Sequence, residues 1–438
     1  MPFSLAIIGA GPAGLTLARL LQVASVDISI TIFERDASPT SRFFQGGSLD
    51  LHTDTGLAAL KKAGLWEEAL KYLRYEGEEL FIADKNDTII IHMKSQPNSK
   101  SRESQLDYER PEIDREVLKE MLLESVESDW VEWGKTLQSI EPNSGILTFR
   151  DGSTAGPFDL VVGADGAWSK VRHVLTNVRP HYAGICGFES RIAKPKEEHP
   201  KLSKMVGKGS YFSYSDGKCL TAQRMGDDSI KIGAWVKKEN NESWATDLLV
   251  TCGDNEEKLK DRILENYEDW TRQQKELIRV STRFRASPLY ELPVGHTWDH
   301  KKGYTLIGDA ASLMTPFAGE GVNKAMKDSL ELAEALEQAL KEQGNVDEAV
   351  RKYEENMFPR AKRYQKKTMT NKQGMFSREG PVTFLVGMID GAAEEMGKDL
   401  SKGWIAWVPL KTMMYAYVVS IQTLGTWRRR VRDWFSRD

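Results

Sequence analysis

The chain opens with the stretch Ser4-Leu5-Ala6-Ile7-Ile8-Gly9-Ala10-Gly11-Pro12-Ala13-Gly14, an apolar run that leads into three closely spaced glycines. A second β-branched run at residues 28–33 ends at Glu34 and Arg35. This order predicts a strand, a tight turn, a helix and a second parallel strand, the unit that holds an adenine dinucleotide. Gly9 permits the turn, Gly11 lets the backbone approach a pyrophosphate, and Gly14 lets the helix pack on the sheet.

The start of this helix, after Pro12 and Ala13, presents amide N–H groups and the positive end of the helix dipole to a phosphate. The carboxylate of Glu34 is placed to accept the ribose hydroxyls of the adenosine half. The alternative is a glycine-rich turn of any α/β protein, because a bare glycine pattern often arises by chance. The flanking strand, helix and acid at the expected distances favour the dinucleotide.

The bulk composition describes an ordinary globular protein. The chain has 438 residues, enough for two or three domains, with 40% hydrophobic and 28% charged residues. Its formal net charge of −4 gives no reason to expect a nucleic-acid partner. The three cysteines lack CxxC spacing, so we expect no disulfide framework and no metal site. With no apparent signal segment, these features indicate a cytoplasmic protein.

Two later segments repeat the design of a buried strand that ends in small residues and an acid. The first is Leu160-Val161-Val162-Gly163-Ala164-Asp165-Gly166, and the second is Tyr304-Thr305-Leu306-Ile307-Gly308-Asp309. A long helix is expected to follow the second segment, from about residue 319 to 343. The first domain is therefore predicted to be discontinuous, over residues 1–78, 107–175 and 286–345. Within it we expect helices at 55–72 and, capped by Asp114, from Arg115.

A different pattern covers residues 79–106 and 176–285. Alternating apolar and polar residues predict antiparallel strands at 79–83, 88–92, 188–192, 210–214, 219–222 and 229–235. Such a sheet has one face free to cover a ligand. Residues 255–282 are helical and strongly charged, and are predicted to form a solvated amphipathic surface. A bridging helix at 346–380 and an aromatic-rich helical tail at 381–438 complete the prediction.

Together the three motifs resemble those of the flavoprotein monooxygenases related to para-hydroxybenzoate hydroxylase. The resemblance narrows to the tetracycline-inactivating monooxygenases through Gly46-Gly47-Ser48-Leu49-Asp50-Leu51-His52, Pro111-Glu112-Ile113-Asp114-Arg115 and Pro316-Phe317-Ala318-Gly319-Glu320-Gly321-Val322-Asn323. It implies an α/β fold in which a Rossmann-like FAD-binding domain, a three-layer β/β/α structure, joins a mostly antiparallel β-sheet substrate domain and C-terminal helices.

The resemblance also implies the cofactor contacts. Asp309 is expected to meet the hydroxyls of the ribityl chain, while the helix start at Gly319 to Asn323 stabilises negative charge on the reduced flavin. Asp165 belongs to a segment shared between FAD and NAD(P)H, for which Arg42 is a further candidate, although Arg42 is equally well an ordinary loop arginine. The expected cofactor-binding residues are Gly9, Gly11, Pro12, Ala13, Gly14, Glu34, Arg35, Arg42, Gly47, Asp50, Arg115, Asp165, Asp309, Pro316, Gly319, Gly321, Val322 and Asn323.

Substrate recognition is expected on the second domain. Glu189 and Arg191 share one face of a strand, and that face is expected to overlook the flavin. Arg191 or Lys231 would anchor a phenolate or enolate, or donate a proton, although Lys231 also suits a plain surface position. Phe317, Met225 and Phe212 would supply apolar lining or belong to the core. Glu189, Gly209 and Lys231 stand where tetracycline-modifying relatives carry other groups, so tetracycline is not the expected substrate.

The resemblance implies a complete reaction. NADPH or NADH reduces FAD, O2 forms a C4a-hydroperoxide, and one oxygen atom passes to an aromatic or polycyclic small molecule in a site that excludes water. One alternative is a flavin-dependent halogenase, but the segment Trp404-Ile405-Ala406-Trp407-Val408-Pro409 departs from the WxWxIP pattern and lies beyond the third motif. Another alternative is a flavin-binding redox protein without oxygenase turnover.

The tail leaves three interpretations open. Residues 404–427 are aromatic-rich and carry only Lys411 as a charge, and Arg428-Arg429-Arg430-Val431-Arg432 follows. This pattern suits a helix packed on the protein or between copies, a helix at a membrane surface, or a membrane span. The first is favoured because Pro409, Lys411 and Gln422 weaken a span.

Overall fold

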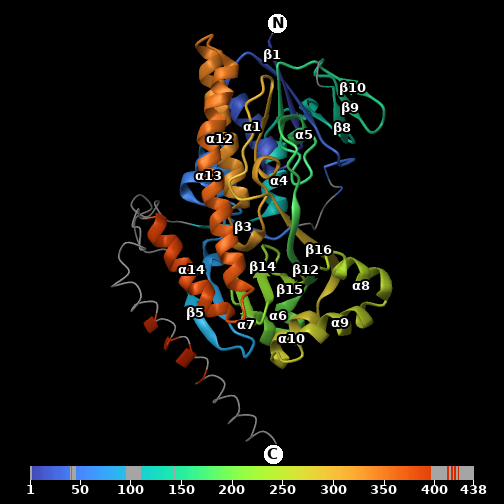
Figure 1. Ribbon diagram of the computed structural model, residues 1–438, viewed down its shortest axis with the longest axis vertical. Coiled ribbons are helices and arrows are strands. Elements are labelled where there is room, and N and C mark those ends of the chain that lie inside the picture. Colours follow the sequence, from blue (N-terminus) through green and yellow to red (C-terminus); the bar gives the residue numbers. More distant parts are fainter. Residues whose placement is uncertain are drawn as a thin grey trace, which may run out of the picture. The chain divides into compact units, whose positions relative to one another are not determined.

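The computed structural model describes residues 2–39, 41, 46–94, 110–141 and 144–395, together with 412, 413, 416, 417, 419, 420 and 423 (Figure 1). The chain forms two compact units. The first contains residues 1–75, 100–181 and 290–368, and the second contains residues 76–99, 182–289 and 369–438. Residues 95–109, which include the end of the predicted segment 79–106, and nearly all of the tail from 404 fall outside the described residues.

The first unit is built on a five-stranded parallel sheet. Its strands, in spatial order, are β17 (Tyr304–Leu306), β11 (Leu160–Gly163), β1 (Phe3–Ile8), β2 (Ile28–Phe33) and β7 (Val131–Glu132). Successive strands move outward from β1 in one direction and then, from β11, in the other. The order therefore reverses between β1 and β11, and the ends of these strands are where a doubly wound sheet binds its ligand.

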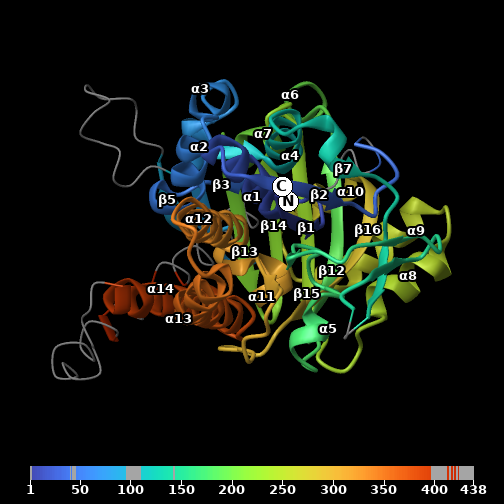
Figure 2. The ribbon, with the colours of Figure 1, turned by 90° about the horizontal axis from the view of Figure 1, so that it is seen from above.

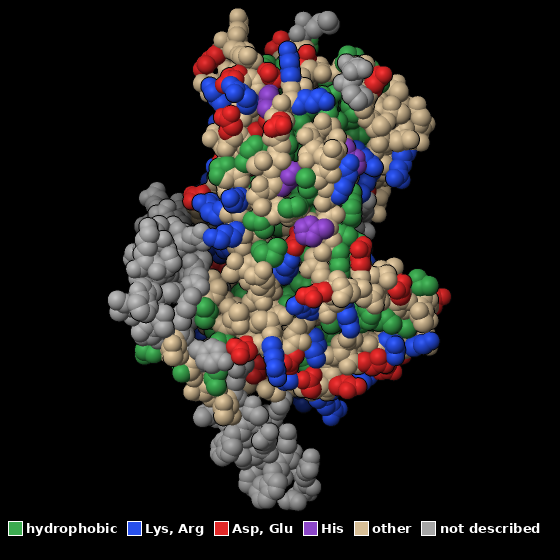
Figure 3. Space-filling model, in the orientation of Figure 1, with side chains coloured by type: hydrophobic (Ala, Val, Ile, Leu, Met, Phe, Trp, Pro, Cys, Tyr) green, Lys and Arg blue, Asp and Glu red, His purple; other side chains and the backbone are tan. Residues whose placement is uncertain are grey.

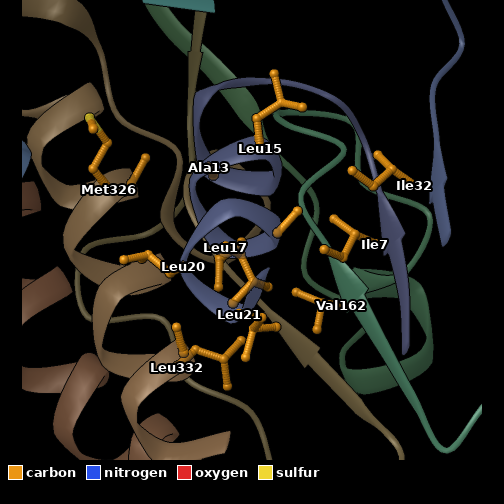
Figure 4. Close-up of a cluster of buried hydrophobic side chains, with 14 of the residues drawn as sticks. Ile7, Ala13, Leu15, Leu17, Leu20, Leu21, Ile32, Val162, Met326 and Leu332 are labelled. Atoms are coloured by element: carbon orange, nitrogen blue, oxygen red, sulfur yellow. The ribbon is translucent and has the colours of Figure 1, made fainter. Parts of the chain in front are cut away.

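Helices cover one face of this sheet. Ile7, Ile32 and Val162 point from neighbouring strands toward α1 (Pro12–Ala24), whose other side meets Met326 and Leu332 of α12 (Gly321–Lys341) (Figure 4). Helix α4 (Arg115–Glu124) packs beside α1, and α12 lies alongside the first part of α13 (Val346–Met375), as Figures 1 and 2 show. Apolar positions on these helices recur at helical spacing, so each buries one stripe.

A small antiparallel sheet covers the opposite face. It consists of β10 (Thr154–Ala155), β9 (Leu147–Phe149) and β8 (Leu137–Ile140). Phe33 follows Ile32 on β2, so its ring points away from α1. That ring meets Phe149 of β9, with ring centroids 4.8 Å apart. The predicted three-layer β/β/α arrangement is confirmed.

Short elements connect these layers. The expected continuous helix at 55–72 was wrong, because the segment divides into a π-helical turn at Thr53–Leu57, α2 (Ala58–Lys62) and α3 (Trp66–Ala69). Gly64 breaks it with a φ of +69°, a conformation that glycine adopts without strain. The other connecting elements are the ribbon of β3 (Ser48–Asp50) and β6 (Glu112–Asp114), α5 (Arg172–Leu175), α11 (Asp309–Ser312) and 3₁₀ turns at Tyr75–Glu78, Ser128–Trp130 and Pro316–Ala318.

The second unit contains a seven-stranded sheet. Its order is β16 (Thr282–Glu291), β12 (His181–Ile192), β15 (Ile230–Lys237), β14 (Lys218–Arg224), β13 (Ser210–Ser215), β4 (Leu80–Ala83) and β5 (Ile89–Met93). The contact between β13 and β4 is parallel, whereas β12, β15, β14 and β13 pair antiparallel, as do β4 and β5. The predicted mostly antiparallel sheet is confirmed.

One face of this second sheet is closed by helices. These are α6 (Pro195–Glu198), α7 (Pro200–Val206), α8 (Trp244–Cys252), α9 (Glu256–Leu264) and α10 (Arg272–Arg279), with a 3₁₀ turn at Glu265–Tyr267. The charged segment 255–282 is amphipathic as predicted, because Leu259, Ile263 and Leu277 pack on the sheet beside Phe188 and Ile232. The other face carries alternate residues of the same strands, and α14 (Gly380–Glu395) covers part of it at Tyr214.

Charged side chains of both signs lie on the surface (Figure 3). On the face drawn in Figure 3, Lys and Arg side chains are interspersed with Asp and Glu side chains over the described parts. Within the described ranges, moreover, no helix is long and apolar enough to cross a membrane.

Candidate functional site: a cofactor site at three strand ends

The first two motifs touch one another at the strand ends. Gly9 has a φ of +114°, and a Cβ atom added to it would lie 2.5 Å from the carbonyl oxygen of Ala164. A Cβ on Gly14 would lie 2.1 Å from the carbonyl oxygen of Gly9. Both distances are far below van der Waals contact, so the packing of the chain itself requires these two glycines. The roles predicted for them, in the turn and in helix packing, have a direct steric cause.

Gly11 and Gly321 are different, because no steric contact with the described residues requires a glycine there. A Cβ on either residue would meet no described atom within 4 Å, and Gly11 has an ordinary φ of −86°. These glycines begin α1 and α12, where unpaired backbone N–H groups face outward. Space held open at two helix N-termini fits a large anionic ligand that approaches the backbone closely. The glycine pattern therefore suits a dinucleotide cofactor.

Glu34 is fixed in place by the glycine turn. Its Oε2 accepts a hydrogen bond of 2.6 Å from the N–H of Ala10, and its Oε1 accepts one of 3.0 Å from the N–H of Asp36. The side chain is only 7% exposed. Each carboxylate oxygen keeps a further lone pair, so this geometry still permits bonds to ribose hydroxyls. The neighbouring Arg35 is exposed, and Arg42 lies outside the described residues.

The second motif forms a tight turn after β11. Asp165 accepts a 2.7 Å hydrogen bond at Oδ2 from the N–H of Lys170, and burial raises the pKa of its carboxyl group. Its Oδ1 is buried with no hydrogen-bond partner in the part of the chain that the structure describes. Arg172, fully buried, donates to the carbonyl oxygens of Ala167 and Ala310. Arg172 thereby connects this turn to the third strand end.

The third motif presents a carboxylate that the protein leaves unused. Asp309 follows β17, and no described residue forms a hydrogen bond with its carboxylate. Burial raises the pKa of Asp309, and the charges of Lys324 and Arg115 offset only part of that effect. A partly buried carboxyl group without a bond is costly unless a ligand satisfies it. The hydroxyls of a ribityl chain are a suitable partner.

Sequence reasoning missed the residues that hold Asp309 in place. The preceding residue, Gly308, donates its N–H to Asp328 at 3.0 Å, and its carbonyl oxygen accepts from Lys324 Nζ at 3.0 Å. Lys324 and Asp328 form a 2.6 Å ion pair, and both are fully buried. Arg360 of α13 adds a 2.8 Å bond to Asp328. The available signal was a lysine and an aspartate four residues apart on the apolar stripe of α12.

The segment that begins α12 meets the β3 strand. Gly319 has a φ of +68°, and a Cβ there would lie 3.0 Å from Asp50 Oδ1. The side chain of Asn323 is buried, and it donates to the Asp50 carbonyl and accepts from His52 N–H and Thr55 Oγ1. A contact of Asn323 with a cofactor would therefore use its backbone or the second N–H of its amide group. Pro316 is exposed and Val322 is half-buried.

Arg115 adds a positive charge near these residues. Its backbone N–H donates to the carbonyl oxygen of Gly47 at 3.1 Å, and its stem lies against Gly46. The guanidinium group is exposed and forms no hydrogen bond with any described residue. Asp114 occupies the N-cap position of α4 as predicted, but its carboxylate pairs with Arg74 at 2.8 Å and does not cap the helix.

The three expected substrate residues share one face of the second sheet. Arg191 of β12 stands directly opposite Lys231 of β15, and Glu189 lies two positions along β12. Glu189 accepts from Lys231 at 2.6 Å and from Arg285 at 2.7 Å. Burial raises the pKa of Glu189, but these two cations outweigh it and hold that pKa below its usual value.

Arg191, on the same face, already has partners within the protein. It bonds to Asp227 and to Ser229 Oγ, at 2.7 Å each. The residues expected to form an apolar lining have different surroundings. Phe212 lies on this face of β13, whereas Met225 is buried. Phe317 belongs to the first unit, in the turn before α12.

Comparisons with known proteins agree with this geometry. Residues 3–368 match the family described as FAD binding domain. The chain is 34% identical to the monooxygenase asqM of Emericella nidulans over 382 residues, which cover 76% of this chain and 84% of asqM. It is 32% identical to the monooxygenase penA of Penicillium thymicola over 450 residues, or 91% of this chain and 98% of penA.

The fold is also that of a solved protein from the group suggested by the motifs. The crystal structure of tetracycline destructase Tet(51) has a TM-score of 0.62 and 18% sequence identity, and the match covers 89% of this chain and 98% of Tet(51). At that identity the likeness concerns the fold. The family match and the long alignments with asqM and penA carry the conclusion that this chain belongs to the FAD binding domain family and is an FAD-dependent monooxygenase.

Proposed function

We propose that the protein consumes NADPH or NADH and inserts one atom of O2 into an aromatic or polycyclic small molecule. The balanced reaction takes substrate, O2, NAD(P)H and a proton to hydroxylated or epoxidised substrate, NAD(P)+ and water. The bound FAD would supply the redox chemistry, through reduction by NAD(P)H and a flavin C4a-hydroperoxide. The observation that carries the proposal is the unused carboxylate of Asp309 beside two helix starts kept open by glycine.

Each part of the cofactor would meet chemistry that suits it. Glu34 would bind the adenosine ribose, the N-terminus of α1 the pyrophosphate, and Asp309 the ribityl hydroxyls. The start of α12 would then lie at the flavin ring, where its positive dipole favours the negative charge of the reduced form. Arg115 would add a cation at the same end. We also propose cofactor contacts for Asp50, Gly47 and the backbone of the Pro316–Asn323 segment.

The substrate would bind on the open face of the second sheet. Glu189, Lys231 and Arg285 form one charged group there, and Phe212 supplies an aromatic surface. Since Glu189 already neutralises one cation, the group carries one net positive charge, which suits an ionised phenol or enol. Among weaker relatives is the kynurenine 3-monooxygenase of Stenotrophomonas maltophilia, 26% identical over 94% of this chain and 87% of its own length. Its name supports an aromatic substrate.

The deciding experiment follows labelled oxygen. Purified protein, reconstituted with FAD, is incubated under ¹⁸O2 with NADPH or NADH and a panel of phenolic and polycyclic compounds. We expect NAD(P)H consumption to accelerate with some compound and yield a product that is heavier by one ¹⁸O atom. Failure of the label to enter any product would favour a flavin-binding redox protein, and a chlorinated product formed only with chloride would favour a halogenase.

Two substitutions then test the substrate face. Lys231→Met removes the cation beside Glu189, and we expect it to raise KM for an ionised substrate at least tenfold while FAD binding is unchanged. Lys237→Met is the matched control, because Lys237 lies on the same strand and pairs with the exposed Glu239 at 2.8 Å. Equal effects of the two substitutions would remove Lys231 from the proposed site.

A further inference from the structure

A chain of four ionisable side chains runs along the cofactor site of the first unit. His52 Nε2 lies 2.9 Å from Asp50 Oδ2, and His52 Nδ1 lies 3.6 Å from Glu320 Oε2. The other oxygen of Glu320, Oε1, pairs with Lys367 Nζ at 2.8 Å. These residues come from β3, the segment after it, the turn before α12 and the middle of α13. Four separate segments therefore contribute to one polar path.

The path leads from solvent to the turn before α12. At one end, the side chain of Lys367 is 28% exposed. In the middle, Glu320 is 3% exposed, and its Oε2 has no hydrogen-bond partner among the described residues. At the other end, Asp50 Oδ1 lies 3.0 Å from the position that a Cβ of Gly319 would occupy. The buried Oε2 of Glu320 faces the imidazole of His52 at a distance longer than a hydrogen bond. A small movement would let the two groups share a proton.

Other charged groups surround this path. Glu112 of β6 stands opposite Asp50 in the antiparallel pair, and burial raises the pKa of Glu112 to about 7. Tyr364 of α13 interacts with Glu320, and burial raises the pKa of that tyrosine. The amide oxygen of Asn323 accepts a hydrogen bond from the backbone N–H of His52. This bond leaves the imidazole ring of His52 free to exchange protons.

We propose that His52 takes up a proton when the bound FAD is reduced and releases it on reoxidation, with Glu320 and Lys367 exchanging that proton with solvent. The inference rests on the proposed position of the flavin ring at the start of α12. A two-electron reduction places two electrons and one proton on the flavin and leaves one added negative charge. A negative charge at that place would favour the protonated form of His52, so a second proton would enter from solvent.

The test is the pH dependence of the reduction potential of bound FAD, which requires no substrate. For two electrons, each proton taken up changes the reduction equilibrium tenfold per pH unit, or about 30 mV. We expect the wild-type protein to show two protons per two electrons over part of the range from pH 5.5 to 8.5, and His52→Asn to show one. His300→Asn is the matched control, because His300 also sits between two carboxylates, Glu354 and Asp347, and should leave the slope at the wild-type value.

Three outcomes decide the proposal. A wild-type slope of one proton throughout would overturn it, as would a His52→Asn slope equal to that of the wild type. The absorbance spectrum of the reduced flavin shows whether the second proton is on the flavin itself, which would also overturn it. If His52→Asn fails to bind FAD, Glu320→Gln gives the answer: without that anion, the second proton should be taken up only at lower pH. A missing ¹⁸O product would leave these titrations unaffected, so the two proposals fail separately.

Discussion

A single buried lysine, Lys324, holds the backbone of Gly308, the residue before Asp309. Its ammonium group bonds to Asp328 and to the Gly308 carbonyl, and no part of it is exposed. We expect Lys324→Met to lower the free energy of unfolding by about 3 kcal/mol, because Asp328 then keeps Arg360 as its only cationic partner among the described residues. The FAD dissociation constant should also rise. Urea unfolding and fluorescence titration with FAD measure the two effects.

Lys327 of the same helix provides the control for that substitution. It pairs with Glu331 at 3.6 Å on a side chain that is 28% exposed. A helix-surface pair of this kind contributes about 0.3–0.5 kcal/mol. Lys327→Met should therefore change neither stability nor FAD binding appreciably, and a loss as large as that of Lys324→Met would show that burial is not the cause.

His300 should make the stability of the first unit depend on pH. It bonds to Glu354 at 2.7 Å and to Asp347 at 3.2 Å. Burial lowers the pKa of His300, but its two carboxylate partners outweigh burial and raise that pKa overall. A raised folded-state pKa adds stability that is complete below the unfolded value, about 6.5, and is lost as pH rises through the folded value.

The difference in unfolding free energy between wild type and His300→Asn should accordingly be larger at pH 6.0 than at pH 8.5, as measured by urea unfolding at each pH. His181→Asn serves as a comparison, because His181 is exposed and lies 3.6 Å from its acidic neighbour Glu291. Its effect should vary much less with pH. A His300→Asn effect that grows with pH would contradict the assigned sign.

At the scale of one element, the turn between β1 and α1 contains glycines of two kinds. Some are required by the packing of the chain, and others are expected to leave space for the cofactor. Gly14→Ala would place a Cβ 2.1 Å from a backbone oxygen, whereas the Cβ of Gly11→Ala would have no described atom within 4 Å. We expect Gly14→Ala to destabilise the protein even without FAD. Gly11→Ala should leave the FAD-free stability within about 0.5 kcal/mol of wild type and weaken FAD binding at least tenfold. Thermal unfolding with and without FAD distinguishes these effects.

At the scale of the whole molecule, periodicity and strand-end chemistry predicted most of the architecture. The parallel strands were recognisable because residues such as Val161 and Val162 form short runs buried on both faces. The sheet of the second unit was recognisable from the period-two alternation around Phe188 and Ile232. Two short strands, β8 and β10, carry too few apolar residues to show a period. The break at Gly64 in the predicted helix 55–72 was missed because the leucines before and after Gly64 continue at helical spacing.

The parts of the site that escaped prediction depend on tertiary contacts. Nothing local to Lys324 or Glu320 indicates that these side chains meet partners 16 and 47 residues away. A charged residue in sequence is most often a solvated one. Only the fold, which brings β3, β17, α12 and α13 together, shows that these side chains support the site.

The two separate hydrophobic cores predict that FAD protects the molecule unevenly. One core lies in the sheet and helices of the first unit, and the other joins the second sheet to α7–α10. FAD at a hundred times its dissociation constant stabilises the unit that binds it by about 2.7 kcal/mol. Hydrogen exchange should therefore slow for the amides of β1 and β11 more than for those of β14 and β15, and Asp309→Ala should abolish the difference. Equal slowing in both sheets would mean that the two units unfold as one cooperative body.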